Sequence, residues 1–566
     1  MTPLAMILYP FAAALVFRVL PFVLAIPSAL LVGFLLLPAG VHYDVPLLPS
    51  LTKTSTPVFV TLLMIFLFMP RPSPYAQRSA SAPKDELLVL PGWIPRARWV
   101  QALIALFVIA PMMTALLNGD WLTYGPTTLR ALTLYDGANM VQLALVAVLP
   151  FLIGRRFLAG EDGHRALLLA LLTAGLIYSL PTLAEVRLSP QLHNIVYGYF
   201  PHSWLQHVRG DGFRPVVFLN HGLVLSMFLC TAALAIAAYM RAIDGEQRIL
   251  YFLGAAYMTV VVFLSKSLGM TLVACVLIPV ILFCSVRVQM VVAGGVAALV
   301  FAYPFMRTVG INPLMAVVGF VEGFAPERAA SLAFRLNMED RLIDRMLERP
   351  LFGWGSLGRS ELWSATGFNT AVRDGLWIIQ IGERGVFGFV SQFGLLCLPI
   401  MMLALKAKPY ALSAATAGLC LVLAANALDL VPNAGITPYT FLVAGALAGR
   451  LELGAAQAPE AHAALARSDG APGPQAAAAR GPAPADASVR DGQVYARVTA
   501  DKVRSPARKP GSGSGPRPAT GRIGPPHAAP APAKSATPRQ KPPGDSASET
   551  NYSRYPIRPS RKPGRA

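Results

Sequence analysis

The chain has 566 residues, of which 54% are hydrophobic and only 14% are charged, with a formal net charge of +19. Soluble domains carry about 25% charged residues, so this composition argues against an ordinary soluble globular protein. The motifs GxxxxGK, HExxH and GxSxG are missing, which argues against a P-loop nucleotidase, a zinc protease and an α/β-hydrolase.

Apolar runs recur from the N-terminus to about residue 450, and most approach the roughly 20 residues needed to cross a hydrocarbon core. Only helices satisfy their own backbone groups in lipid, and the alternating pattern of a barrel is missing. We therefore predict an all-α, polytopic membrane bundle of about 12–13 transmembrane helices. The predicted spans are residues 4–20, 22–38, 57–70, 99–117, 138–153, 166–182, 216–240, 249–264, 268–285, 288–306, 376–402, 409–428 and 434–450.

The N-terminus lacks the pattern of a cleaved signal peptide, so its first apolar run is predicted to be a retained helix. The five cysteines all lie within predicted spans, and no CxxC pair occurs. Their positions suggest neither a disulfide framework nor a zinc site, so we expect no metal and no cofactor.

Basic residues in short loops predict the orientation. They gather in five loops that alternate along the spans, near residues 71–98, 155–165, 241–248, 287 and 406–408. The positive-inside rule places these loops in the cytoplasm. The two long polar segments, 183–215 and 307–375, then face the opposite side, together with residues 40–56, 118–136, 265–267 and 429–433.

After Arg450 the composition changes abruptly to Ala, Pro, Gly, Ser and Arg. Residues 451–566 lack apolar periodicity, which predicts a disordered, basic, cytoplasmic tail following a membrane domain at 1–450. Its charge suits attraction to anionic membrane lipid, and the alternative is a solvated tail without a specific partner. Without interleaved aromatic residues or an RNA module, we expect no specific nucleic-acid partner.

The end of segment 183–215 carries Arg209 and Arg214, and His221 follows in the helix predicted to start near Pro215. Arg214 and His221 are seven residues apart, so both can lie on one helix face. A guanidinium forks onto phosphate oxygens, which makes Arg209 and Arg214 candidates for binding a lipid diphosphate. His221 is a candidate catalytic base lining a cavity. The alternative is headgroup contact for the arginines and a satisfied buried imidazole.

Segment 307–375 contains an amphipathic helix predicted over Ser331–Glu348 and ended by Pro350. Of the residues on this helix, Arg335 is our first candidate for a functional role, and Arg341 is a second candidate for binding an anion. The alternative is that these charges form a surface network of ion pairs. The following turn, Phe352-Gly-Trp-Gly355, is predicted to bring its backbone close to another segment.

Asp374 precedes the span at 376–402, where its carboxylate could accept a proton from an attacking sugar hydroxyl. It could also be the N-cap of that helix, and the two roles are compatible. Lys266, in the turn at 265–267, is a further candidate for the diphosphate. Glu383 and Arg384 are predicted to form a buried ion pair.

Three of these stretches resemble the O-antigen ligase and polymerase superfamily. They are Arg214-Pro-Val-Val-Phe-Leu-Asn-His221, Glu348-Arg-Pro-Leu-Phe-Gly-Trp-Gly355, and Asp374-Gly-Leu-Trp followed by Gly382-Glu-Arg-Gly-Val-Phe-Gly388. The resemblance implies a glycosyltransferase of the bacterial inner membrane that works on the periplasmic face. Such an enzyme moves glycan from undecaprenyl diphosphate to a sugar, lipid or protein acceptor, without metal or nucleotide sugar.

The resemblance gives diphosphate-binding roles to Arg214 and Arg335. Where the family has a catalytic His, this chain has Asp374, and segment 307–375 contains no His. Either Asp374 is then the base, or His221 is the base from another helix, or the chain is not a standard member of the family. Related cell-wall polymerases use an Asp. Two alternatives differ in kind: a polysaccharide or lipid transporter, and a non-catalytic scaffold that binds other polysaccharide assembly proteins.

Overall fold

The computed structural model describes residues 1–44, 49–70, 88–209 and 212–469, with side chains except those of Arg209 and residues 456–469. The chain divides into two units, Met1–Ala478 and Ala479–Ala566, and all described residues belong to the first. Most of the predicted tail, residues 470–566, therefore lies outside the described residues.

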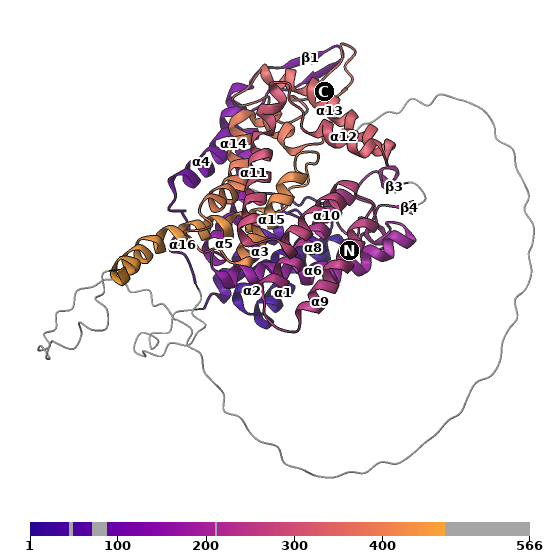
Figure 1. The fold of residues 1–566 in the computed structure, drawn as a ribbon. Helices are drawn as coiled ribbons and strands as arrows, with labels where there is room; N and C mark the ends of the chain where they lie inside the picture. The colour runs from indigo at the N-terminus through magenta and orange to yellow at the C-terminus, as the bar shows by residue number, and fades with distance from the viewer. Residues whose placement is uncertain (45–48, 71–87, 210–211, 470–566) are drawn as a thin grey trace, which may run out of the picture. The chain divides into compact units, whose positions relative to one another are not determined.

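The described residues are mostly helical (Figure 1). The helices are α1 (Thr2–Val19), α2 (Phe22–Leu36), α3 (Ser55–Phe68), α4 (Arg98–Leu117), α5 (Leu134–Phe157), α6 (Glu161–Leu188), α7 (Leu192–Tyr197), the 3-10 helix η2 (Trp204–His207), α8 (Gly222–Ala242), α9 (Arg248–Leu264), α10 (Leu268–Phe283), α11 (Val286–Thr308), α12 (Leu314–Glu322), α13 (Pro326–Leu347), α14 (Leu376–Leu405), α15 (Ala414–Asp429) and α16 (Pro438–Asp469). Two antiparallel hairpins join β1 (Leu122–Tyr124) to β2 (Thr127–Leu129) and β3 (Val208–Arg209) to β4 (Gly212–Phe213).

Every span predicted from the sequence coincides with one of these helices. Among the described residues, seven helices are long and apolar enough to cross a membrane: α1, α4, α5, α6, α8, α11 and α14. The apolar helices α2, α3, α9, α10 and α15 are shorter. α16 continues past residue 450, where the predicted membrane domain ends.

Small residues let helices distant in sequence pack closely. α16 packs along α5, and a Cβ on Gly445 would overlap the carbonyl of Phe151. α8 is almost entirely buried between α6, α9, α10 and α15. Close backbone approach of this kind is typical of helices that pack without a hydrophobic driving force.

α14 is broken at Gly385, whose φ is +67°. The turn predicted after α13 enters this break: Val386 donates its backbone N–H to the Pro350 carbonyl (2.8 Å), and Trp354 donates to the Gly382 carbonyl (2.8 Å). Gly355 likewise donates to the Glu383 carbonyl at 2.9 Å. The turn thus pairs backbone groups that the interrupted helix leaves free, which confirms the predicted close approach of its backbone.

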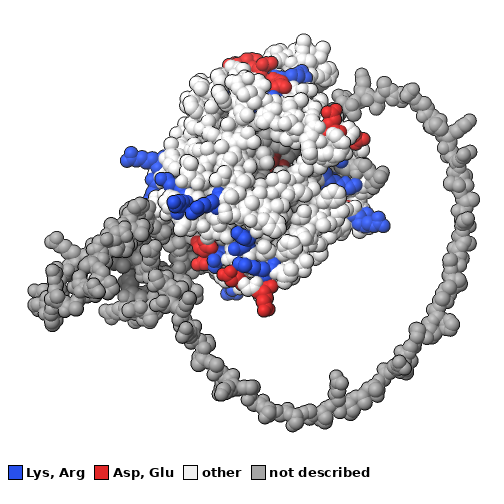
Figure 2. Space-filling model, in the orientation of Figure 1, with Lys and Arg blue, Asp and Glu red and all other residues white. Residues whose placement is uncertain are grey.

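Charged side chains lie at the ends and edges of the face in Figure 2 and leave a broad uncharged surface between them. Many large apolar side chains are exposed, including Phe11, Phe66, Val291 and Phe305, each at least 63%. Water would disfavour so much exposed apolar surface, whereas hydrocarbon would not. The surface therefore agrees with the apolar helices in favouring a membrane environment.

Contacts join several of the segments that the positive-inside rule predicts to lie on the side opposite the cytoplasm. Thr127 in the β1–β2 hairpin donates to the Gly367 carbonyl at 2.9 Å. Arg335 donates to the Pro432 carbonyl at 3.2 Å, which links segment 307–375 to residues 429–433. Figure 1 shows α12, α13 and β1 at the same end of the described unit.

Candidate functional site

The stretch between β4 and α8 is not helical, contrary to prediction. His221 is the N-cap of α8, and its Nδ1 accepts the backbone N–H of Leu223 at 3.0 Å. The helix therefore begins at Gly222 rather than near Pro215, and His221 does not lie two turns inside it. Arg214 and His221 consequently do not share a helix face.

The hydrogen bonds of Glu185 explain why α8 does not begin near Pro215. Its carboxylate, at the end of α6, accepts the backbone N–H groups of Val216 (2.8 Å), Val217 (2.7 Å) and Leu192 (2.9 Å). Val217 also adopts a φ of +54°, which a helix cannot contain. A buried carboxylate thus fixes the loop behind Arg214. Glu185 was not among the residues predicted from the sequence, although its place just after an apolar run was an available signal.

Arg214 lies against the turn that carries Lys266. The Arg214 guanidinium donates to the Lys266 carbonyl at 3.1 Å, and Ser226 of α8 bonds to Ser265 at 2.8 Å. A Cβ built on Gly212 would lie 2.6 Å from Lys266 Nζ. Arg214 and Lys266, both predicted to bind the diphosphate, are therefore neighbours. The Arg209 side chain lies outside the described residues, although its backbone pairs with Gly212.

Three histidines meet beside Arg214. Nitrogen atoms of His202, His207 and His221 all lie within 4.8 Å of one another. Their ring centroids are 4.8 Å apart for His202 and His221, 5.0 Å for His207 and His221, and 5.6 Å for His202 and His207. Of these three histidines, only His221 was a candidate from the sequence, and no metal site was predicted. Four histidines, His193, His202, His207 and His221, lie between residues 193 and 221, and this local enrichment was the available signal.

His221 is poorly suited to the role of base. Its Nδ1 accepts a backbone N–H, so in the neutral ring the proton lies on Nε2. Burial lowers the pKa of His221, and the charges of His207, His202, Arg214 and Arg335 lower it further. Arg214 and Arg335, which come from two distant segments, thus both contribute to the lowered pKa of His221.

Arg335 and Asp374 form an ion pair. Arg335 Nε lies 3.4 Å from Asp374 Oδ2, and the two side chains are 27% and 28% exposed. Arg335 also donates to Asn433 Oδ1 at 3.2 Å, and Asn433 donates to buried Asp429 at 2.7 Å. The pair is therefore partly accessible and supported from residues 429–433.

Asp374 is not the N-cap of α14, which corrects that expectation. Gly375 occupies the cap position, and the Leu376 N–H donates to the carbonyls of Leu430 (2.9 Å) and Asn433 (3.0 Å). Because backbone carbonyls take the N–H of Leu376, the Asp374 carboxylate is left to pair with Arg335.

Two further predictions need revision. Arg341 is exposed on α13, and its described contact is with the Met338 sulfur at 4.0 Å, so the structure does not bring it to Arg335. Glu383 pairs with Arg373 at 3.0 Å, whereas Arg384 lies over the Phe107 ring, 5.8 Å from its centroid. Adjacent residues on a helix do not face each other, so these two side chains meet different surroundings.

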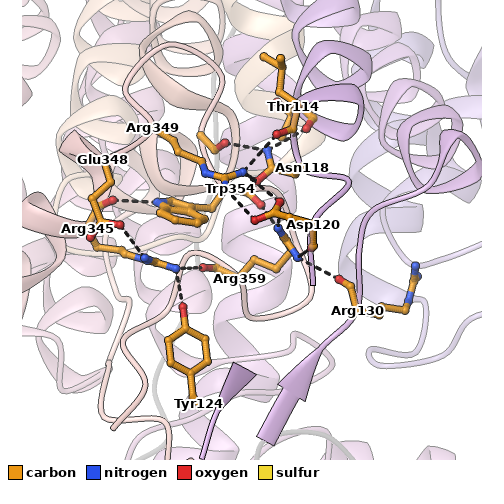
Figure 3. Close-up of polar contacts among 12 residues, drawn as sticks. Thr114, Asn118, Asp120, Tyr124, Arg130, Arg345, Glu348, Arg349, Trp354 and Arg359 are labelled. Atoms are coloured by element: carbon orange, nitrogen blue, oxygen red, sulfur yellow. Dashed lines mark hydrogen bonds and ion pairs between the residues drawn. The ribbon is translucent and has the colours of Figure 1, made fainter. Parts of the chain in front are cut away.

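A polar network holds the turn at 350–355 (Figure 3). Asp120 pairs with Arg349 at 2.8 Å and with the fully buried Arg359 at 2.9 Å. The Trp354 ring is covered by Arg345 and Arg349, whose guanidinium carbons lie 3.3 Å and 4.1 Å from its centroid. These side chains contact one another, so the network stabilises the turn at 350–355. It is not itself a candidate ligand site.

The charges of this network lower the pKa of Asp120. Partial burial raises the pKa of Asp120, but its hydrogen bond to Arg349 and the charges of Arg349 and Arg359 lower it more, so the net pKa is below its usual value. The carboxylate is therefore ionised wherever the network is formed near neutral pH. Neither Asp120 nor Arg359 was predicted from the sequence.

No family model matches this chain, and no curated protein matches it. The resemblance to O-antigen ligases and polymerases therefore depends on the short motifs alone.

Proposed function

We propose that this chain is a multi-pass glycosyltransferase of the bacterial inner membrane, with about 12–13 spans and a cytoplasmic tail. It transfers glycan from undecaprenyl diphosphate to an acceptor hydroxyl on the periplasmic face, by polymerisation or ligation. The observation that carries the proposal is the partly exposed ion pair of Arg335 and Asp374 at 3.4 Å. Arg214, from the other polar segment, supports it, because it contacts the turn that carries Lys266 and, like Arg335, lowers the pKa of His221.

Positive charge is what a carrier diphosphate requires. The diphosphate is an activated leaving group, and negative charge grows on it as the bond to the sugar breaks. Guanidinium groups stabilise that charge through charge-assisted hydrogen bonds. Arg214 and Arg335 supply guanidinium groups and Lys266 supplies an ammonium group, from three separate stretches. The partial exposure of Arg335 leaves it able to contact a ligand.

The reaction needs one proton acceptor. The acceptor oxygen bonds to the anomeric carbon of the carrier-linked sugar, the bond from that carbon to the diphosphate oxygen breaks, and the diphosphate leaves with the electron pair. The hydroxyl proton passes to Asp374 Oδ. General-base assistance of this kind contributes about 10²–10⁴-fold. Asp374 suits the role better than His221, whose Nδ1 is occupied as a helix cap.

Reconstitution tests the proposal. Purified protein in liposomes with lipid-linked glycan should produce longer or transferred chains without nucleotide and without an ion gradient. Asp374→Asn should abolish the product while the protein remains folded. Movement of intact lipid-linked glycan across the bilayer, without any new glycosidic bond, would instead identify a transporter.

A further inference from the structure

We propose that His202, His207 and His221 form a binding site for a divalent transition metal, and that Zn²⁺ fits it best. The proposal does not depend on glycan transfer, because the transfer scheme uses Asp374, Arg214 and Arg335. Neutral imidazole is the commonest protein ligand for zinc and related ions.

The geometry supports this assignment. The three rings come from separate elements: the loop after α7, the helix η2 and the N-cap of α8. They nevertheless bring nitrogen atoms within 4.8 Å of one another. Zinc–nitrogen bonds of about 2.0–2.1 Å in a tetrahedron require nitrogens somewhat closer than this. A modest inward rotation of the rings would therefore complete the site.

Hydrogen bonds already orient one ring for ligation. His207 Nδ1 lies 3.0 Å from the Ser203 carbonyl, so Nδ1 carries the proton. Nε2 accepts the backbone N–H of Gly222 at 3.4 Å, a long hydrogen bond that a bond to a metal would replace. Metal-binding histidines typically donate their second nitrogen to a carbonyl in this way. His221 must change tautomer: ligation through Nε2 moves its proton to Nδ1 and breaks the cap on Leu223. One capping bond is weak compared with a metal–nitrogen bond.

The surroundings determine the fourth ligand. Three protein ligands leave one tetrahedral position open, as in catalytic rather than structural zinc sites. The side chain of Arg214 passes over Gly222, where an added Cβ would lie 2.5 Å from Arg214 Cγ and Cδ. Its positive charge next to His221 disfavours a metal with only neutral ligands. The fourth ligand is therefore an anion, either hydroxide or an oxyanion.

A bound metal would connect the segment at 202–207 to the start of α8. Arg214 lies between these two parts in the sequence, and its N–H donates to the His207 carbonyl at 2.7 Å. The metal would thereby restrict the loop that presents Arg214. Ions that bind only the folded state also raise its stability by mass action.

The experiment measures Zn²⁺ directly on the full chain, purified without a histidine tag. Protein stripped with a chelator is equilibrated with Zn²⁺, separated from free metal, and its zinc content is determined by elemental mass spectrometry. Wild type should retain zinc, and His202→Ala and His207→Ala should each lose most of it. His42→Ala, at an exposed histidine outside the cluster, should retain the wild-type amount.

A second readout uses wild type alone, in case the variants fail to fold. Zn²⁺ should raise its unfolding temperature, and Co²⁺ should give the visible absorption of a four-coordinate site. Zinc content equal to wild type in both cluster variants would overturn the proposal. So would a wild-type protein that neither retains zinc nor changes its unfolding temperature. Neither result would affect the glycan-transfer proposal.

Discussion

Arg335 on α13 and Asp374 before α14 form an ion pair at 3.4 Å that is neither fully buried nor fully exposed. Exposed ion pairs contribute about 0–1 kcal/mol to stability, so a purely structural role would be a weak reason for this arrangement. The proposed transfer gives the pair a further role, in which the cation binds the diphosphate and the carboxylate accepts the hydroxyl proton.

Replacing these two residues should affect transfer together. Arg335→Ala and Asp374→Asn should each lower the transfer rate by at least about 10²-fold, and the double variant should lose little more, since the two act as one unit. Rates are measured with lipid-linked glycan in liposomes. Arg328→Ala and Asp344→Asn, on the same helix, should stay within about twofold of wild type. Fully additive losses would argue against a shared role.

Glu185→Gln should release the loop behind Arg214. A carboxamide can still accept from Val216 and Val217, but its NH₂ would face the Leu192 N–H, which costs about 1–3 kcal/mol. We expect a lower unfolding temperature, faster proteolysis within residues 192–217 and slower transfer. Glu161→Gln, which breaks an ion pair on the same helix with side chains 48% and 38% exposed, provides the control. Equal behaviour of the two variants would be inconsistent with this role for Glu185.

Gly385→Ala should destabilise the protein. Its φ of +67° and ψ of −169° lie in a region that is essentially restricted to glycine, and an added Cβ would overlap the Leu351 carbonyl. The cost should be at least about 1–3 kcal/mol, measured by thermal unfolding in detergent. Gly295→Ala in α11 meets open space and should be neutral or stabilising by up to about 1 kcal/mol. An unchanged stability of Gly385→Ala would contradict the packing of the turn at 350–355 into the break of α14.

Asp120 should make stability depend on acid pH. Because its folded-state pKa lies below the unfolded value of about 3.9, its contribution is complete above that value and is lost as the pH falls through the folded-state pKa. The difference in unfolding free energy between wild type and Asp120→Asn should therefore be constant near neutral pH and shrink below about pH 4. A difference in unfolding free energy that grows on acidification would contradict this prediction.

The sequence predicted the helices well because apolar length is a local property, and all predicted spans coincide with helices. It also placed Arg335 on an amphipathic helix and a tight glycine turn after it. Predictions from the sequence were wrong where tertiary contacts override the local sequence pattern. Pro215 looked like a helix start, but the distant Glu185 carboxylate binds the backbone there, so α8 begins at Gly222.

The side chains that gather at the site were harder to predict. Asp374 looked like a cap, yet the carbonyls of Leu430 and Asn433 bind the first backbone N–H of α14. The histidine cluster depends on how η2 and the β3–β4 hairpin fold back onto α8, and no spacing along the chain encodes that. Asp120 and Arg359 are also far apart in sequence, so only the fold reveals their pairing.

The most direct test is the binding of undecaprenyl diphosphate to purified protein in detergent. Arg214→Ala and Arg335→Ala should each weaken binding by about tenfold or more, because each removes a charged hydrogen-bond donor. Arg328→Ala should bind as tightly as wild type. Unchanged affinity in both Arg214→Ala and Arg335→Ala, with the proteins folded, would contradict a shared headgroup site.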